Sequence, residues 1–220
     1  MATSGDGRSA NPGEAEHVAT SPSRGASPEA NARLTGSTAA VLLVLLAAEG
    51  FTILRVRALL SVHVFLGMVL VPLVALKVGS TSYRFVRYYL GSRPYRRKGP
   101  PPLVLRMLGP LLVVLTVILF ASGIILLLVP PPSRPPFLLF HKASFVLWFG
   151  AMAIHVLAHL VDTTRLATRD WIGRTRRDVA GAGLRQWTLI SSIAIGVLLG
   201  VLLLGQVAPW LTSSVSHGGR

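Results

Sequence analysis

The chain has 220 residues, with 22 Lys and Arg against 8 Asp and Glu, yet 51% of it is hydrophobic and only 14% is charged. A soluble domain is about 25% charged, so a basic protein this apolar is not expected to be a nucleic-acid binder, and the lipid bilayer is the better solvent for it. The absence of cysteine excludes disulfides, Cys-ligated iron–sulfur clusters and thioether-attached haem within this chain. Any metal or redox chemistry must therefore use other side chains.

The first 33 residues predict a disordered cytoplasmic tail. They are rich in Ala, Ser, Gly, Pro and Glu, with one Val and no aromatic residue, so they cannot bury enough surface to offset the entropy of ordering. They also lack the apolar core of a secretory signal peptide. A second short tail is expected over residues 213–220.

Residues 34–212 predict an all-α integral membrane fold, a bundle of about five transmembrane helices. Each apolar segment reaches the roughly 20 residues that a helix needs to cross a bilayer core about 30 Å thick. The segments span residues 35–54, 58–82, 103–129, 136–161 and 186–210. Only a few residues around Arg55 and Arg57 separate the first two, so a first helix that lies partly in the interface remains an alternative.

The basic residues predict the orientation of the helices. They concentrate in two segments separated by two helices, which must therefore lie on one side of the membrane. By the positive-inside rule this side is cytoplasmic, with the C-terminus outside a plasma (inner) membrane. Membrane insertion and contact with anionic lipids thus account for most of the positive charge, and binding to nucleic acid is not needed to explain it. The residues are Arg84, Arg87, Arg93, Arg96, Arg97, Lys98 and Arg106, and Arg165, Arg169, Arg174, Arg176, Arg177 and Arg185.

Four histidines, His63, His141, His155 and His159, lie inside predicted spans. An ionisable residue within a membrane is by default a candidate functional site. His63 and His141 each fall about five residues from the outer end of helices that run the same way, so they are expected at one depth. His155 follows His141 by 14 residues, a net rotation of only about 40°. The same face of this helix therefore carries histidines at two depths, an outer position at His141 and an inner position at His155.

Small residues beside these histidines favour a flat cofactor. A haem iron takes axial imidazoles from two facing helices, and its macrocycle needs a close apolar wall. Gly67 provides a gap on the face of His63, four residues further on, and Ser122, Gly123 and Gly150 are candidates for similar gaps. Interhelical hydrogen bonding or another metal remains the alternative role of the two histidines.

The pattern resembles the membrane-embedded b-type cytochromes, which include bacterial cytochrome b561 and the cytochrome b subunits of formate dehydrogenases and hydrogenases. The resemblance covers roughly residues 35–210 and is carried by His63-Val-Phe-Leu-Gly67, by His141-Lys-Ala-Ser and by His155-Val-Leu-Ala-His159. It implies a haem-binding four-helix core in which His63 and His141 hold an outer haem b. It also implies electron transfer between a quinone and a partner oxidoreductase subunit, rather than a stand-alone enzyme.

The residues at the inner position differ from the pattern of that family. The position 14 residues after His63 is Lys77, where the family has a second histidine. His155 and His159 cannot take opposite sides of one iron, because side chains at i and i+4 point the same way. Either one haem binds or a second has an unidentified ligand. Lys77 is then a haem ligand, a propionate partner or a snorkelling lysine, and His155, His159 and Asp162 also form a run suited to a divalent metal.

Three further charged residues have more than one interpretation each. Glu49 is expected to pair with Arg55 or Arg57 at the interface, with a proton-relay role or a contact with a haem-side group as the alternatives. Arg84 and Arg87 follow the second span among aromatic residues, as interface anchors do. They are also the candidates to bind haem propionates or a quinone head group.

Gly196 and Gly200 form a G-x-x-x-G packing face in the last span, for a contact within the chain or with another subunit of an oligomer. The competing functional class is a non-redox membrane protein with structural histidines, such as a metal-handling protein, transporter or assembly subunit.

Overall fold

The computed structural model describes residues 28–93, 103–172 and 181–215, and its regular elements in these ranges are all helical. Five helices are long and apolar enough to cross a membrane by length and composition. The chain is therefore an all-α, multi-pass membrane protein, as predicted. The tail predicted over residues 1–33 lies mostly outside the described residues, but its last part, residues 28–33, belongs to the first helix.

The helix boundaries differ from the predicted spans mainly where polar residues continue a helix. The five long helices are α1 (Pro28–Leu54), α2 (Leu60–Tyr89), α4 (Leu103–Leu128), α5 (Arg134–Trp171) and α7 (Ala182–Leu203). Helices α2 and α5 run past the predicted ends at 82 and 161, because Arg and Thr lower hydropathy without breaking a helix. The last predicted span instead breaks at Leu203, continuing as η2 (Leu204–Val207) and α8 (Ala208–Val215).

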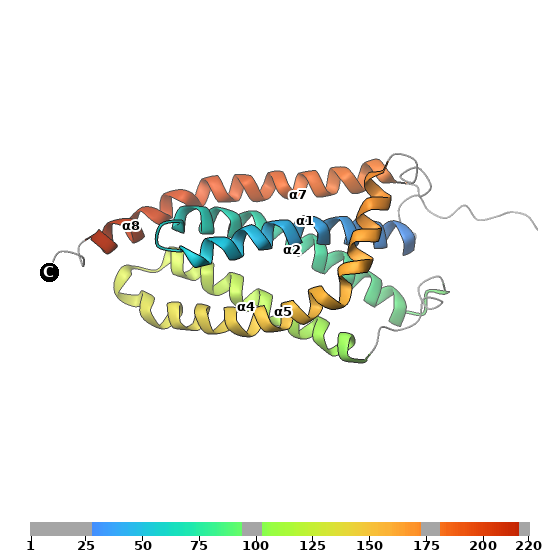
Figure 1. The fold of residues 1–220 in the computed structure, drawn as a ribbon, viewed down its shortest axis with the longest axis horizontal. Coiled ribbons are helices and arrows are strands. Elements are labelled where there is room, and N and C mark those ends of the chain that lie inside the picture. The colour runs from blue at the N-terminus through green and yellow to red at the C-terminus, as the bar shows by residue number, and fades with distance from the viewer. Residues whose placement is uncertain (1–27, 94–102, 173–180, 216–220) are drawn as a thin grey trace, which may run out of the picture.

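Four helices form a ring. Helix α1 packs on α2 and α5, α4 packs on α5, and a looser contact between α2 and α4 closes the ring. Helix α7 packs outside it, against α2 (Figure 1). Helices α2 and α5, which carry the four intramembrane histidines, thus face each other across the ring rather than as neighbours. This four-helix arrangement positions the candidate site.

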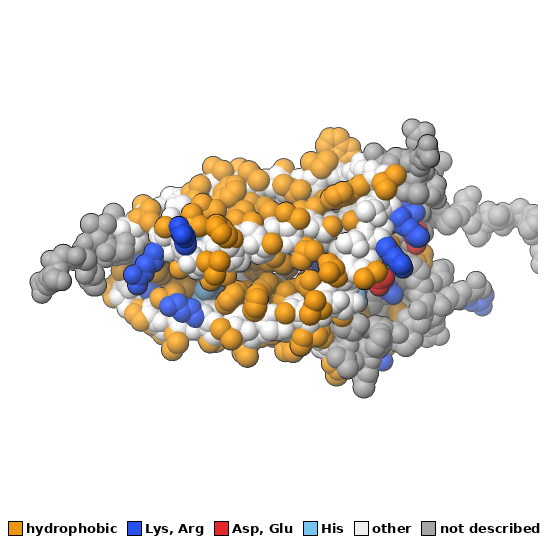
Figure 2. Space-filling model, viewed as in Figure 1, with side chains coloured by type: hydrophobic (Ala, Val, Ile, Leu, Met, Phe, Trp, Pro, Cys, Tyr) orange, Lys and Arg blue, Asp and Glu red, His pale blue; other side chains and the backbone are white. Residues whose placement is uncertain are grey.

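One end of the bundle collects the predicted basic segments. The N-terminal ends of α1, α4 and α7 and the C-terminal ends of α2 and α5 meet there, at the right of Figure 1. We call it the basic end. Figure 2 shows hydrophobic side chains over the middle of the molecule, with Lys and Arg toward its ends. This distribution suits an apolar layer flanked by water and lipid headgroups.

Glycines allow the closest helix contacts. A Cβ added to Gly196 would lie 2.6 Å from the Val69 carbonyl oxygen of α2, and one added to Gly200 would lie 2.6 Å from Phe65 Cδ2. The G-x-x-x-G face therefore packs within the chain and is not free to join a second subunit, so the oligomer contact through it is not supported. Gly36 plays a similar part between α1 and α5, a contact that the sequence analysis did not identify.

A buried hydrogen bond joins α4 to α5. Trp148 Nε1 donates to Thr116 Oγ1 at 2.8 Å, and both side chains are buried. We expect Trp148→Phe to lower the stability of the purified protein by about 0.6 to 1.7 kcal/mol, because it removes one interhelical hydrogen bond. Thermal unfolding in detergent measures the effect. The control is Trp187→Phe, at a side chain that is 68% exposed, and equal losses in the two variants would contradict the prediction.

Candidate functional site

His63 lies in the first turn of α2 and contacts the end of α1. Its Nδ1 atom is 2.9 Å from Glu49 Oε1 and 2.9 Å from Thr52 Oγ1. The Thr52 hydroxyl donates its own hydrogen to the Glu49 carbonyl oxygen at 2.6 Å, so it accepts from the imidazole. His63 therefore carries its proton on Nδ1. The predicted pairing of Glu49 with Arg55 or Arg57 is replaced by this contact.

The short link between α1 and α2 produces this geometry. Helix α1 ends at Leu54 and α2 begins at Leu60, so the last turns of one helix lie beside the first turn of the other. Glu49 and Thr52 are three residues apart and share a helix face. A Cβ on Gly67 would lie 3.7 Å from Glu49 Oε1, so Gly67 borders the carboxylate that contacts His63.

His141 has a similar environment between α4 and α5. Its Nδ1 atom is 2.9 Å from Ser122 Oγ. The Ser122 hydroxyl donates to the Leu119 carbonyl oxygen at 2.9 Å, so its oxygen accepts from Nδ1–H of His141. A Cβ on Gly123 would lie 3.2 Å from His141 Cε1, so this glycine makes room for the ring. Gly150 has nothing within 4 Å of such a Cβ and forms no comparable wall.

The two histidines thus make the same kind of contact. Each donates Nδ1–H to an oxygen of a neighbouring helix, and in the neutral imidazole with this tautomer Nε2 is the nitrogen that carries the lone pair. They lie on α2 and α5, which face each other, and are close enough for their charges to interact. We call them the His63–His141 pair.

Lys77 lies on the same helix as His63, further toward the basic end. Its ammonium donates to the Thr35 carbonyl oxygen of α1 at 3.1 Å. The Thr35 hydroxyl donates to Ser80 Oγ at 2.9 Å, and Asn31 Nδ2 donates to the Ser80 carbonyl oxygen at 3.0 Å. Lys77 is thus held inside an α1–α2 polar cluster, and its ammonium contacts α1 rather than snorkelling to the interface.

His155 and His159 occupy successive turns of α5, with ring centroids 4.8 Å apart. Both are half-buried and within electrostatic range of Lys77. Among the described residues, no three His, Cys, Asp or Glu side chains form a group that could hold a metal ion. The divalent-metal alternative for His155, His159 and Asp162 therefore finds no support in this structure.

Arg84 and Arg87 are exposed on the last turns of α2. Arg84 is close enough to His159 for their charges to interact. Exposed aromatic rings lie next to the two arginines in the sequence, as expected for interface anchors; they are Tyr83, Phe85 and Tyr89.

The fold and the placement of its polar groups define a helical multi-pass membrane protein with histidines inside the bundle. No family model, no curated protein and no solved structure matches the chain.

Proposed function

We propose that the chain is an integral-membrane b-type cytochrome, with haem b held between His63 Nε2 and His141 Nε2. It passes electrons between a quinone pool and a partner oxidoreductase. One observation carries the proposal: His63 and His141 lie on two helices that face each other across the ring of helices, and each places Nδ1 2.9 Å from an oxygen of a neighbouring helix, so that Nε2 is the nitrogen left to bind a metal. Metal-ligating histidines almost always have such an outer partner, which fixes the tautomer and the ring orientation.

The residues present fit a haem. Neutral imidazole is an iron ligand, and α2 and α5, which face each other across the ring of helices, would each supply one. Bound haem supplies reversible one-electron transfer, while the protein supplies orientation, burial and electrostatics. Glu49, Thr52 and Ser122 hold the Nδ1 protons, and Gly123 leaves space beside the His141 ring. The buried Val64 follows His63 directly and packs in an apolar cluster that excludes water on this side of α2.

The visible spectrum of protein purified from a haem-replete host tests the proposal. A Soret band and a reduced α-band of a low-spin bis-imidazole haem are expected, and their absence would overturn it. Pyridine haemochrome stoichiometry then gives one haem or two. A value of two would assign His155 or His159 to a second haem near Lys77, with Arg84 and Arg87 as the candidates to bind its propionates or a quinone head group.

A structural role is the second candidate, because each histidine hydrogen bond also joins two helices. In a non-redox membrane protein, the Nδ1 contacts would serve only as interhelical hydrogen bonds. A structural role would require only the Nδ1 hydrogen bond, whereas haem ligation would require both ring nitrogens. A substitution that keeps the Nδ1 hydrogen bond but removes Nε2 therefore distinguishes the two functions, because it should abolish haem binding but leave a purely structural role intact.

The proposed orientation places the basic end in the cytoplasm of a plasma (inner) membrane. The two basic segments, 84–106 and 165–185, meet the described helices at this end, which the positive-inside rule assigns to the cytoplasm. The C-terminus is then outside. Reporter fusions after residues 92 and 215 should be active on the cytoplasmic and external sides, respectively, and the reverse pattern would contradict the assignment.

The Glu49 carboxylate should lower the reduction potential of the proposed haem. Its negative charge beside His63 favours the oxidised iron, which carries one more positive charge. We expect Glu49→Gln to raise the midpoint potential by on the order of 50 mV, where 59 mV corresponds to a tenfold change for one electron. Potentiometric titration measures the shift. Glu29→Gln, at a carboxylate paired with Arg33 at the basic end, is the control, and a fall in the potential of Glu49→Gln would contradict the reasoning.

A further inference from the structure

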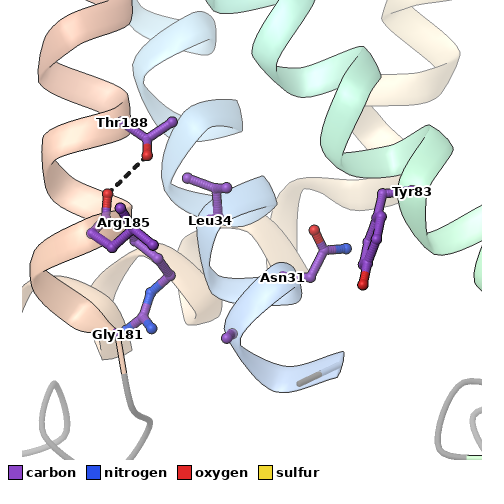
Figure 3. A pocket seen from close by; sticks show the side chains of 8 residues that line it. Asn31, Leu34, Tyr83, Gly181, Arg185 and Thr188 are labelled. Carbon is purple, nitrogen blue, oxygen red and sulfur yellow. Dashed lines mark hydrogen bonds between the residues drawn. The ribbon is translucent and has the colours of Figure 1, made fainter. Parts of the chain in front are cut away.

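The polar groups of the cavity at the basic end are already engaged. This cavity lies between α1, α2 and α7, has a volume of about 200 Å³ and includes Tyr83, Arg185 and Thr188 in its lining (Figure 3). Tyr83 and Arg185 have interaction partners within the protein, and Thr188 donates to the Leu184 carbonyl oxygen at 2.8 Å. The charges at the opposite end of the bundle differ in this respect.

Three exposed cations lie at the end opposite the basic end. Arg55 and Arg57 belong to the link between α1 and α2, and Lys142 lies on α5, next to His141. The link and the first turns of α5 meet at the left of Figure 1, and Figure 2 shows Lys and Arg side chains at this end. We call Arg55, Arg57 and Lys142 the outer patch. None of the three forms an ion pair with a described residue.

No described carboxylate neutralises the outer patch. The structure describes the side chains of three acidic residues, Glu29, Glu49 and Asp162. Glu29 and Asp162 lie toward the basic end, and Glu49 contacts His63 at 2.9 Å. Even if the charge of Glu49 is counted in full, the three cations of the outer patch leave the described part of this end positive.

Membrane insertion does not account for these charges. In the proposed orientation this end is external, and the positive-inside rule concentrates Lys and Arg in cytoplasmic loops. Two arginines in a link of five residues, 55–59, run against that tendency. Arg57 lies six residues before His63, and Lys142 directly follows His141, so the outer patch adjoins the His63–His141 pair. A partner bound here would lie close to the proposed haem.

The link also has the mixed composition of a protein interface. Exposed apolar side chains alternate with its arginines, since Leu54 is 78% exposed and Val56 is 38% exposed. An open depression of about 290 Å³ is lined by residues 53–58, so both arginines border it. Interfaces between proteins combine an apolar centre with a polar rim, and Arg is enriched in them. The depression is large enough for one apolar side chain of a docked protein.

We propose that the outer patch docks an acidic soluble electron-transfer protein, which exchanges electrons with the haem between His63 and His141. The inference rests on the proposed function, which requires an electron partner near this pair. The exchange moves one electron between the two redox centres and forms or breaks no bond. Complementary charge steers the partner to this end and raises its association rate.

Stopped-flow oxidation of the reduced full chain in an uncharged detergent tests the docking. The probes are two soluble one-electron acceptors of opposite charge, plastocyanin, which is acidic, and mitochondrial cytochrome c, which is basic. At low ionic strength we expect plastocyanin to react about tenfold faster. Its rate should fall as salt is added, because salt screens the attraction, and the rate of cytochrome c should rise. Equal rates, or a faster reaction with cytochrome c, would overturn the proposal.

Variants that remove charge locate the surface. The double variant Arg55→Gln/Arg57→Gln should slow the reaction with plastocyanin about tenfold, and Lys142→Gln should slow it by about threefold, with the haem spectrum unchanged in both. All three side chains are exposed, so the variants should fold. Arg165→Gln, which removes an exposed charge toward the basic end of α5, is the matched control and should keep the original rate. An unchanged rate in the double variant would show that docking does not use the link.

Binding measurements separate this proposal from its alternatives. Surface plasmon resonance of the two probes on the immobilised chain needs no haem. Absence of a haem spectrum would overturn the proposed function alone, and the preference for plastocyanin would then still support or refute a docking surface for an acidic protein. Anionic lipid is the competing occupant of the outer patch. A preference that is lost in nanodiscs containing about one-third phosphatidylglycerol would show that lipid headgroups occupy these charges, and would overturn the proposal.

Discussion

His63→Asn and His141→Asn are each expected to abolish the spectrum of the proposed outer haem while leaving the protein folded. Asparagine keeps an N–H near the position of imidazole Nδ1, so the contacts with Glu49 or Ser122 can persist, but it has no counterpart of Nε2. Loss of one axial ligand removes the low-spin bis-imidazole spectrum. Reduced-minus-oxidised difference spectra measure the loss, and circular dichroism with size-exclusion chromatography checks the fold.

His155→Asn is the matched control on the same helix as His141. It should leave the spectrum unchanged if one haem binds and remove only part of it if two bind. A low-spin spectrum that survives unchanged in both His63→Asn and His141→Asn would show that the His63–His141 pair holds no haem. It would favour histidines that only join helices.

Gly196→Ala should be the most destabilising single-methyl change in α7. The new Cβ would lie 2.6 Å from the Val69 carbonyl oxygen and 2.8 Å from Val69 Cα, and backbone atoms of a packed helix cannot move aside cheaply. Overpacking of this kind costs about 1 to 3 kcal/mol. At Gly200 the nearest atoms belong to the Phe65 ring, which can rotate, so Gly200→Ala should cost less.

The control for this change is Gly150→Ala, because an added Cβ there meets nothing within 4 Å. Alanine is the better helix former by roughly 0.5 to 1 kcal/mol, so the control should be as stable as the original chain or slightly more stable. Thermal unfolding in detergent gives the comparison. If Gly196→Ala matched Gly150→Ala in stability, α7 would not pack closely against α2.

The spans could be predicted because apolar length is a local property of the chain. The third span is nearly the same in both descriptions, 103–129 expected and Leu103–Leu128 observed, since prolines flank the apolar run on both sides. Helix ends beyond the apolar layer are not marked in this way. Helix α5 continues to Trp171 through polar residues that a hydropathy criterion reads as a loop.

The proximity of the two histidines could be predicted, but their partners could not. Counting residues from the helix ends predicted that His63 and His141 lie close together, and they are within electrostatic range of each other. The partner of Glu49 was predicted wrongly from closeness in sequence to Arg55 and Arg57. Both arginines are exposed in the link, where water solvates them, whereas Glu49 faces α2 and needs a donor inside the bundle.

Lys77 illustrates why such partners depend on tertiary structure. Its hydrogen bond goes to the backbone carbonyl of Thr35, 42 residues away. Because every residue has a backbone carbonyl, the sequence does not indicate which one will accept this hydrogen bond. Thr52 is similar, because a threonine near the end of an apolar helix is common and only the adjacent turn of α2 gives it a role. Sequence could have suggested Thr52 only through its spacing of three from Glu49.

The contacts between α1 and α2 have a consequence for biogenesis. Helix α1 alone would bring Glu49 into the bilayer without its imidazole partner, and α2 alone would bring Lys77 without the Thr35 carbonyl. A lone charged side chain costs about 2.5 to 3.5 kcal/mol at the centre of an inserting helix, and this value is an upper limit for Glu49, which lies in the last turns of α1. Because residues 55–59 are the whole connection between the two helices, α1 and α2 should leave the translocon as one hairpin, each supplying the hydrogen bonds that make the other soluble in lipid.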